Sequence, residues 1–538
     1  MKKALSLVLA LVMVLSLAAC GGSKPAAPAA PAAPAAPAAP AAPAAPAAPP
    51  APKAPVESDR FVNMVIKVLM NDAGPANNSN IDSTYLLDHV YEGLIKYDEK
   101  TGEVLPRVAK SWKLSDDKSY IEFEINPDVT FHNGDKVTAE DVVFSFNINR
   151  DGSRFGTQFS YFDSWEAVDE DTFKLNLKVG ETGNPLFFVN GVRITSKKVV
   201  EAAGDKAFTT PENSVGTGSY KFTAIDLDGK ITMEAYDKYY RGEAAIKGIN
   251  WTYLTDASTA LVAFQAGDFD VVALPPANIT EMQQMNKYNV LLLPSTHNSF
   301  LAINDEKIPN PLVRQAIYYA LNNEAIMKVA YDGHGVVSTS LAETGTVAGG
   351  YSFDDYYNYN PEKSKELLLQ AGYTQAQLDA GVELGNIVAI AGGPYAKASA
   401  VIQQMLAQVG LKVNVTTFEQ ATVEDMFYRF NNYDDLTLFM HGDNVRMDSL
   451  NFYNGYIKRF DGTRRNIGEE VKKLGAAACA EYDEAKRNEM WVDFWKAVKD
   501  DAIYYSLYHR HNPYIATKDL NVVWGVNYFD IYDWSWNA

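Results

Sequence analysis

The side chains best suited to metal or nucleophilic chemistry in this sequence are its 7 histidines and 2 cysteines. His509 and His511 alternate on an expected strand, so both would face one side, and His441 lies further upstream. A zinc-type site needs three or four ligands, and the sequence has neither a C-x-x-C nor an H-E-x-x-H pattern. We therefore predict no directly bound metal and no cofactor. Cys479 lies in a run of small residues at 475–480, which predicts a buried helix residue rather than a nucleophile.

Carboxylates are abundant enough to suggest hydrolysis, since Asp and Glu together number 67. A glycosidase needs only two carboxylates at a defined separation, so their abundance does not distinguish a glycosidase from other acidic proteins. The sequence contains no Gly-x-Ser-x-Gly nucleophile elbow, no metalloprotease motif and no P-loop. We predict that the chain is not an enzyme, and a secreted hydrolase stays as an alternative.

The first residues have the pattern of an export signal. A short basic start, Met1–Lys3, precedes an apolar run from Ala4 to Leu17 that is too short to span a membrane comfortably. The run ends in Leu-Ala-Ala-Cys at 17–20, which resembles the lipobox of bacterial lipoproteins. That resemblance implies a signal peptide at 1–19 and a lipid on the Cys20 thiol. It further implies an extracytoplasmic protein anchored to the outer face of the bacterial cytoplasmic membrane; an ordinary secretory signal with an incidental cysteine is the alternative.

Residues 20–57 are rich in Pro and Ala, with Pro-Ala-Ala repeats from Pro25 to Pro55. Proline at every third position favours polyproline II, and the segment has no residues that could form a core. Fully extended at about 3.1 Å per residue, the repeats would reach roughly 95 Å. We predict a semi-rigid tether that holds the rest of the chain away from the membrane.

Composition and charge limit what the remaining residues can do. The chain has 538 residues, of which 47% are hydrophobic, so a length of this order predicts two or three lobes with their own cores. Its formal net charge is −19. Nucleic-acid binding needs clustered Lys and Arg, and binding flat to an anionic membrane needs a basic face, so we expect neither.

Local patterns predict a mixed α/β body that begins near Phe61. Apolar residues alternate with charged or polar ones at 121–125 and at 173–177, which predicts two half-buried strands. Between them, Thr138 precedes an apolar stretch with Asp141 three positions on, which predicts an N-capped helix. This part of the chain should form a strand-rich lobe.

The second half of the chain is more helical. Asn310-Pro311 has the residues of a helix start, and a further helix is expected from Pro361 to Gly372. Apolar residues from Val401 to Val409 lie on one helical face, Gly410 ends the helix, and 411–415 alternate as a strand. With 386–390 as its first strand, this segment predicts a βαβ unit and hence a parallel α/β lobe.

Six stretches in order resemble the extracytoplasmic solute-binding proteins that serve peptide and nickel ABC importers, the family 5 type that includes oligopeptide- and dipeptide-binding lipoproteins. The densest match covers sixteen positions, from Phe131 to Phe146. The stretches are Tyr91–Tyr97 with Leu105–Trp112, Phe131–Phe146, Val215–Phe222, Gly267–Val271, Pro311–Ile317 and Asn360–Leu368. Together they extend the resemblance over essentially the whole chain from Phe61 on.

The resemblance implies a periplasmic-binding-protein-like α/β fold of type II, cluster C, with two hinged α/β lobes and an extra strand-rich lobe. The expected segments are 58–98, 216–304 and 507–538 for lobe I, 99–215 for lobe II and 305–506 for lobe III. The function implied is capture of a peptide or peptide-like solute by lobe closure, and its delivery to the permease subunits of an ABC importer. We expect a monomer.

The resemblance also indicates where a solute would bind. In peptide-binding members an Asp that follows a short apolar strand pairs with the ammonium group, and Asp443 matches that position. Met440 replaces the usual aromatic residue and His441 a usual glycine, while Arg446 lies where Tyr-Pro-Asp-Pro is usual. Arg446 could pair with a ligand carboxylate, or it is a surface residue.

The segment expected to cross into lobe III provides two more candidates, Asn298 and Phe300. Family members often contact their ligand here. The departures around His441, together with the existence of nickel-binding relatives, leave a chelated metal or haem as an alternative solute.

Overall fold

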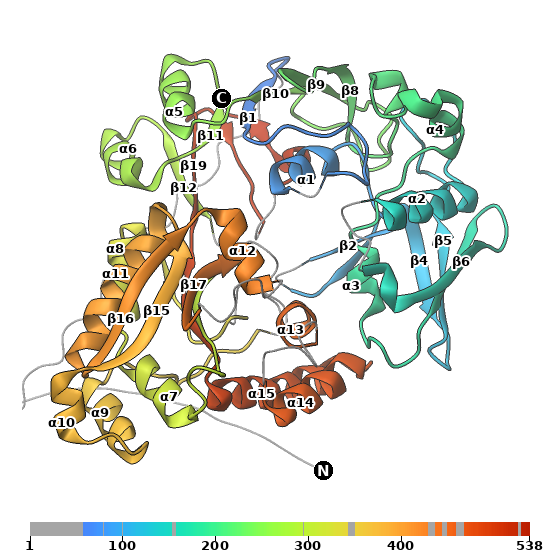
Figure 1. Cartoon of the computed structure of the whole chain (residues 1–538). Coiled ribbons are helices and arrows are strands. Elements are labelled where there is room, and N and C mark those ends of the chain that lie inside the picture. The colour runs from blue at the N-terminus through green and yellow to red at the C-terminus, as the bar shows by residue number, and fades with distance from the viewer. Residues whose placement is uncertain are drawn as a thin grey trace, which may run out of the picture. The chain divides into compact units, whose positions relative to one another are not determined.

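The computed structural model describes residues 58–78, 80–98, 101–152, 158–293, 295–342, 350–428, 436–443, 449–458, 467–525 and 529–537. The predicted signal peptide (1–19), the predicted lipidation site Cys20 and the predicted tether (20–57) lie outside the described residues, as does Arg446. Figure 1 shows three larger sheets, each with its own helices.

The first of these sheets is seven-stranded and mixed. Its order is β12-β19-β11-β1-β10-β9-β8, and β1 runs parallel to both β10 and β11. The strands are β1 (Val62–Ile66), β8 (Tyr220–Ile225), β9 (Lys230–Ala235), β10 (Gly248–Tyr253), β11 (Val271–Ala273), β12 (Asn289–Leu293) and β19 (Asn512–Ala516). Met64 of β1 packs in the cluster that contains α1 (Ile81–Asp88), whereas Val65 packs with α5 (Ala257–Ala266) and α6 (Ile279–Met285). The period of two along β1 therefore places helices on both faces.

The second sheet is four-stranded and antiparallel, in the order β4-β5-β7-β6. It contains β4 (Ala109–Leu114), β5 (Tyr120–Ile125), β6 (Phe162–Ala167) and β7 (Thr172–Leu177). The strands predicted from alternation are confirmed, since Ile121, Phe123 and Ile125 are at most 2% exposed. The capped helix is confirmed as α2 (Ala139–Asp151), where Thr138 and Asp141 form a reciprocal capping box.

The third sheet is six-stranded, in the order β14-β18-β13-β17-β15-β16. It contains β13 (Asn298–Ile303), β14 (Gly335–Val337), β15 (Val382–Ile390), β16 (Leu411–Phe418), β17 (Leu438–Asp443) and β18 (Tyr504–Arg510). The predicted βαβ unit is confirmed, because β15 and β16 pair in parallel and α11 (Gly393–Gln408) connects them. The predicted helix starts at Asn310-Pro311 and at Pro361 are confirmed, since Asn310 is the N-cap of α7 (Pro311–Tyr319) and Asn360 that of α9 (Pro361–Gln370).

Further helices complete the described chain. Around the six-stranded sheet they are α8 (Asn323–Tyr331), α10 (Gln375–Ala380), α12 (Gln420–Tyr428), α13 (Ser449–Phe452), a short π-helix (Tyr453–Ile457), α14 (Glu469–Ala480) and α15 (Glu484–Asp501). Two short strand pairs are β2 (Ile95–Tyr97) with β3 (Val104–Pro106) and β20 (Leu520–Asn521) with β21 (Ser535–Trp536). The helix α3 (Pro185–Val189) contacts β2, and α4 (Lys197–Ala203) contacts α2. Within the described part of the chain, no helix has the length and apolar character needed to cross a lipid bilayer.

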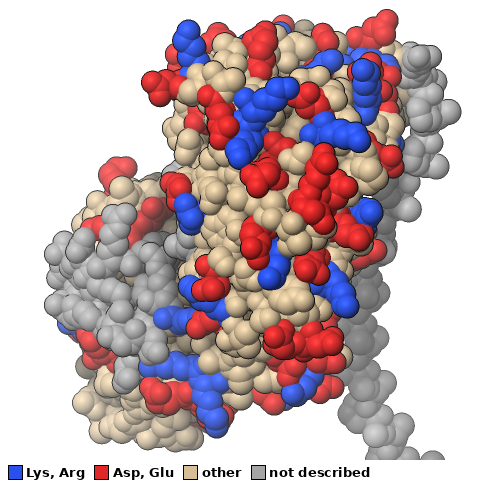
Figure 2. All heavy atoms as spheres, turned by 90° about the vertical axis from the view of Figure 1, so that its right-hand side faces the viewer, with Lys and Arg blue, Asp and Glu red and all other residues tan. Residues whose placement is uncertain are grey.

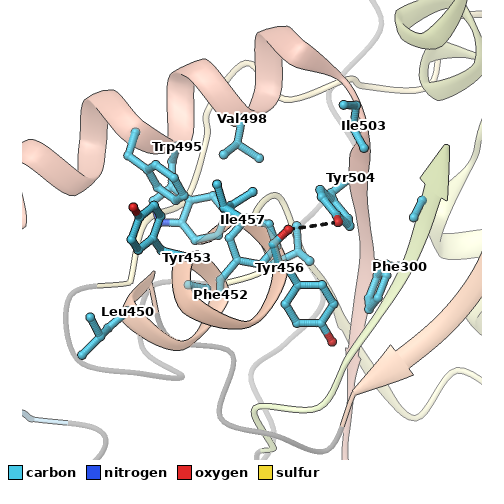
Figure 3. Packing of buried hydrophobic residues seen from close by; sticks show 14 of the residues in the cluster. Phe300, Leu450, Phe452, Tyr453, Tyr456, Ile457, Trp495, Val498, Ile503 and Tyr504 are labelled. Carbon is cyan, nitrogen blue, oxygen red and sulfur yellow. Dashed lines mark hydrogen bonds between the residues drawn. The ribbon is translucent and has the colours of Figure 1, made fainter. Parts of the chain in front are cut away.

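An aromatic core lies between the six-stranded sheet and α15. Trp495 is 1% exposed, and its ring lies tilted against that of Phe452 at 4.8 Å between centroids. Its indole N–H donates to Ser449 Oγ at 2.9 Å. Figure 3 shows these rings together with Phe300 on β13 and Tyr504 on β18, where the Tyr504 hydroxyl donates to the carbonyl of Tyr456 at 3.3 Å. The core thus ties α13, α15 and two central strands into one body.

The pairing of β13 and β18 differs from the expected boundaries between lobes I and III. All of β13 and all of β18 pair within the six-stranded sheet, although residues 298–304 and 507–510 were expected in lobe I. By sheet membership, the chain passes from the seven-stranded to the six-stranded sheet between 293 and 298, and it returns between 510 and 512.

Surface charge is mixed in sign. On the face shown in Figure 2, acidic and basic side chains are interspersed rather than gathered by sign. Two such ion pairs connect α4 to residues near the start of α2, Lys197–Glu140 at 3.0 Å and Lys198–Asp135 at 2.9 Å. Exposed pairs of this kind stabilise a fold by only about 0–1 kcal/mol each, so burial and not surface pairing holds the body together.

A buried carboxyl lies where the four-stranded and seven-stranded parts meet. Glu92 accepts a hydrogen bond from the Tyr239 hydroxyl at 2.8 Å, and its Oε1 lies 3.6 Å from the Arg107 guanidinium. Its other oxygen, Oε2, is buried and has no hydrogen-bond partner in the described part of the chain. Burial raises the pKa of Glu92 to about 7, so the folded protein holds this proton more tightly than the unfolded chain does.

We expect Glu92→Gln to remove a pH-dependent loss of stability. Because the folded pKa is raised, the stabilisation is complete below the unfolded pKa and is lost as pH rises through about 7. The loss should be on the order of 3 kcal/mol between pH 5 and pH 8. Denaturant unfolding of both proteins at the two pH values measures it, and an equal pH response in the parent and in Glu92→Gln would rule this role out.

Candidate functional site

Buried polar side chains concentrate where β13 begins. Thr296, His297 and Asn298 are at most 3% exposed, as are Ser295 and Ser299. The register places Asn298 opposite Asp443, the last residue of β17, and opposite His509 of β18. Cores seldom contain so many polar groups without a structural or binding role, because each must be hydrogen-bonded once it leaves water.

The Asn298 side chain is the centre of one hydrogen-bonded group. Its Nδ2 lies 2.7 Å from Ser506 Oγ, 3.0 Å from Ser338 Oγ and 3.0 Å from His509 Nε2. An amide nitrogen carries two hydrogens, so Nδ2 cannot donate to both serine hydroxyls and to the imidazole at once. If the amide were flipped, its oxygen would take this position and accept hydrogen bonds from the same three groups. Its Oδ1 is buried and has no partner among the described residues, so within this part of the chain one polar amide atom stays unsatisfied in either orientation.

Burial also sets the protonation of this group. Asn298 and Ser506 are 0% exposed, and His509 is 3% exposed. Burial lowers the pKa of His509 to about 4, with backbone hydrogen bonds opposing the shift. The imidazole is therefore neutral at pH 7 and serves as a hydrogen-bonding group rather than as a cation.

A second polar group lies one strand away. His297 Nε2 is 2.9 Å from the hydroxyl of Tyr395, a residue of the first turn of α11, and that hydroxyl lies 3.4 Å from the carbonyl oxygen of Gly442. A Cβ at Gly442 would lie 2.5 Å from both His297 Nε2 and the Tyr395 hydroxyl. A side chain at this position would therefore displace the His297 and Tyr395 side chains.

The structure brings five of the six predicted site residues onto β13 and β17. Phe300 is 0% exposed, and its ring lies 6.0 Å from that of His441 in an edge-to-face arrangement. Met440 is also 0% exposed and belongs to the hydrophobic core. The backbone of Asp443 completes β17, while its side chain and all of Arg446 lie outside the described residues.

Sequence reasoning missed His297, Tyr395, Ser338 and Ser506. His297 stands next to Asn298 in the segment already singled out, so its neighbourhood was the available signal. Tyr395 lies 98 positions from His297, and Ser506 lies 208 positions from Asn298, so no local pattern connects them. The site can offer a solute hydrogen-bond donors, acceptors and aromatic edges.

Two further predictions concerned reactive groups. Cys479 is a 3% exposed residue of α14, as predicted, and burial raises the pKa of its thiol to about 11, so the thiolate is scarce at pH 7. Among the residues with described positions, no three His, Cys, Asp or Glu side chains come together as metal ligands.

The described chain is thus a mixed α/β body with a buried, largely neutral polar site where it enters the six-stranded sheet. The profile described as "Bacterial extracellular solute-binding proteins, family 5 Middle" matches residues 103–459, more than half of the chain. The chain belongs to this family.

Known relatives agree with this assignment. The chain is 28% identical over 365 residues to the dipeptide-binding protein of Escherichia coli (strain K12), a match that covers 61% of this chain and 66% of that protein. It is 29% identical over 364 residues to haem-binding protein A of Haemophilus influenzae, covering 62% and 65%. The matches thus span just under two thirds of the length of these relatives.

Solved structures share the fold. HbpA2 from Haemophilus parasuis superposes with a TM-score of 0.77 at 22% identity, covering 89% of this chain and 100% of that one. The expected periplasmic-binding-protein-like α/β class is confirmed, and identity at this level shows the fold alone.

Proposed function

We propose that the chain captures a peptide or peptide-like solute outside the cytoplasm and delivers it to the permease subunits of an ABC importer. The observation that carries the proposal is Asn298 Oδ1, which has no hydrogen-bond partner among the described residues and is buried beside the backbone of Asp443 where the chain enters the six-stranded sheet. A peptide has exposed N–H and C=O groups that suit such a site, and an ammonium group that suits the Asp443 carboxylate. The dipeptide-binding relative supports this choice of solute.

The proposal includes three lobes that close over the solute. Lobe I is built on the seven-stranded sheet, lobe II on the four-stranded sheet and lobe III on the six-stranded sheet. The pairing of β13 and β18 supports hinges at 294–297 and at 511 in place of the expected positions at 304/305 and 506/507. Closure would exclude water and so strengthen each polar contact to the solute.

The proposal also includes export and anchoring. The lipobox-like residues 17–20 support cleavage after residue 19 and lipidation of Cys20, and the Pro/Ala-rich segment 20–57 would tether the body to the cytoplasmic membrane. The protein would act as a monomer and without turnover of its solute.

A chelated metal or haem is the second candidate solute. The observation that favours it is that two histidines, His297 and His441, lie beside Tyr395. His297 is hydrogen-bonded to the Tyr395 hydroxyl at 2.9 Å, and the His441 ring lies 6.0 Å from the Tyr395 ring between centroids. Imidazole is a common ligand of iron and nickel. The haem-binding relative supports this candidate.

Native mass spectrometry of the purified full chain, followed by thermal unfolding with candidate solutes, tests the proposal. We expect a retained peptide, and a stabilisation of about 2.7 kcal/mol when free peptide is at 100 times its Kd. The peptide should be recovered intact. Cleaved products would favour the hydrolase, whereas a shift with haem or nickel–histidine and none with any peptide would favour the second candidate.

A further inference from the structure

Proposed lobes II and III contact one another away from the candidate site. The loop between β7 and α3 lies against the corner between α14 and α15, where the Gly183 amide donates to the carbonyl of Cys479 at 2.6 Å. The Cys479 thiol lies 3.4 Å from the carbonyl oxygen of Glu181. These bonds join residues almost 300 positions apart, so they exist only when the two lobes meet.

Charged side chains close the same contact from both ends. Lys458, just after the π-helix, pairs with Glu181 at 2.8 Å. Arg487 of α15 donates to the carbonyls of Glu481 and Gly183, at 3.0 Å and 3.4 Å. Arg487 therefore bridges the two segments through backbone acceptors, which are present whatever side chain occupies these positions.

Aromatic side chains of lobe II lie beside these polar contacts. Tyr161 of lobe II stacks on Phe188 at 4.1 Å between ring centroids, and the Lys458 ammonium lies 5.7 Å from the Tyr161 ring. Burial raises the pKa of Tyr161, and the nearby Cys479 and Glu181 raise it further. Cys479 belongs to α14, so α14 lies close to the Tyr161 hydroxyl. The cores of lobes II and III form one continuous cluster, whereas the core of lobe I is separate.

Gly183 leaves no space at this contact. A Cβ there would lie 1.7 Å from the carbonyl oxygen of Glu481 and 2.8 Å from the amide nitrogen of Tyr482. Both atoms are backbone, so no side-chain rotation could make room. The φ angle of Gly183 is outside the left-handed region, so its own loop would accept another residue without strain. Glycine is required here only by the other lobe.

We propose that residues 181–184, together with Lys458 and the 479–487 corner, form a clasp that must open before solute can enter or leave. This inference rests on the proposed function. It adds that the clasp contacts help to set how long the solute stays bound. Interactions made only in the closed arrangement shift the equilibrium toward it, and they slow dissociation of any solute held between the lobes.

Gly183→Ala tests the clasp most directly. We expect a larger radius of gyration in solution without any added solute, and at least tenfold faster dissociation of the peptide found by native mass spectrometry. Gly455→Ala is the matched control, since a Cβ there meets nothing within 4 Å and its φ is also outside the left-handed region. An unchanged radius of gyration in Gly183→Ala would overturn the proposal.

A charge exchange provides an independent test. Glu181→Lys and Lys458→Glu should each speed dissociation about two- to threefold, because the pair is 49% and 46% exposed and contributes modestly. The double exchange should restore the original rate. Glu166 and Lys174 pair at 3.3 Å within lobe II and serve as the control. Glu166→Lys, Lys174→Glu and the double exchange should all leave the dissociation rate unchanged. Failure of the double exchange to restore the rate would contradict a direct pairing across the lobes.

The two readouts separate the clasp from the proposed function. If no peptide binds but Gly183→Ala still enlarges the molecule, the clasp stands and the solute assignment fails. If peptide binds with an unchanged rate and an unchanged radius in Gly183→Ala, the solute assignment stands and the clasp fails.

Discussion

The Phe300→Ala variant should unfold with a free energy about 3–5 kcal/mol below that of the parent chain. Phe300 is 0% exposed on β13, between β17 and β18. Its ring has edge-to-face neighbours in Tyr456 and Tyr504, at 5.9 Å and 6.2 Å (Figure 3). Removing the ring leaves a cavity among side chains that are already fixed by one another, so the structure can collapse around it only in part. Denaturant unfolding followed by circular dichroism measures the change.

A second phenylalanine of the same sheet serves as the control. Phe418 ends β16 and is 36% exposed, so Phe418→Ala should cost less than about 1 kcal/mol. Comparing Phe300→Ala with Phe418→Ala also separates two possible roles of Phe300. The sequence suggested that Phe300 contacts a solute, whereas the structure places its ring in the core. If Phe300→Ala keeps the parent stability and loses only solute affinity, the core role is wrong.

Asp443→Ala should weaken peptide binding by about 2–5 kcal/mol, the scale for losing one partner of a buried charge pair. Asp443 is the last residue of β17 and lies opposite Asn298, so its backbone is at the centre of the polar site. If the carboxylate pairs with the ammonium, an N-acetylated peptide should bind weakly to the parent chain. Isothermal titration of both peptides against both proteins completes a double-mutant cycle.

The cycle distinguishes a direct contact from an indirect one. With a direct ion pair, acetylation should cost little in Asp443→Ala, because the partner is already absent. Asp379→Ala on the exposed part of α10 is the control and should bind like the parent chain. Equal losses on acetylation in the parent and in Asp443→Ala would remove the Asp443 carboxylate from the site.

Much of the local structure could be predicted from residue patterns. The capping box at Thr138 and Asp141, and the strand around Phe123, depend on contacts within a few residues and are as expected. The βαβ segment that ends in β16 was predictable for the same reason. Short-range hydrogen bonding and the period of side chains along an element act alike in any tertiary context.

The candidate site could be predicted only in part. Asn298 and His441 were selected from their place in a family motif, but the burial of Asn298 with Ser506 and His509 was not visible in the chain. His509 was considered instead as a metal ligand that faces the same side as His511. The structure gives it a neutral hydrogen-bonding role, because burial lowers its pKa.

The sequence by itself determined several individual helices and strands, the family motifs and the position of the expected export signal, all of which are recorded in neighbouring residues. Only the tertiary structure decided which sheet β13 joins, which polar groups surround Asn298, and why Gly183 must be glycine. These features depend on partners hundreds of positions away, such as the 211 residues between Asn298 and His509. Their energies arise from burial and packing between segments, which no local pattern of residue types contains.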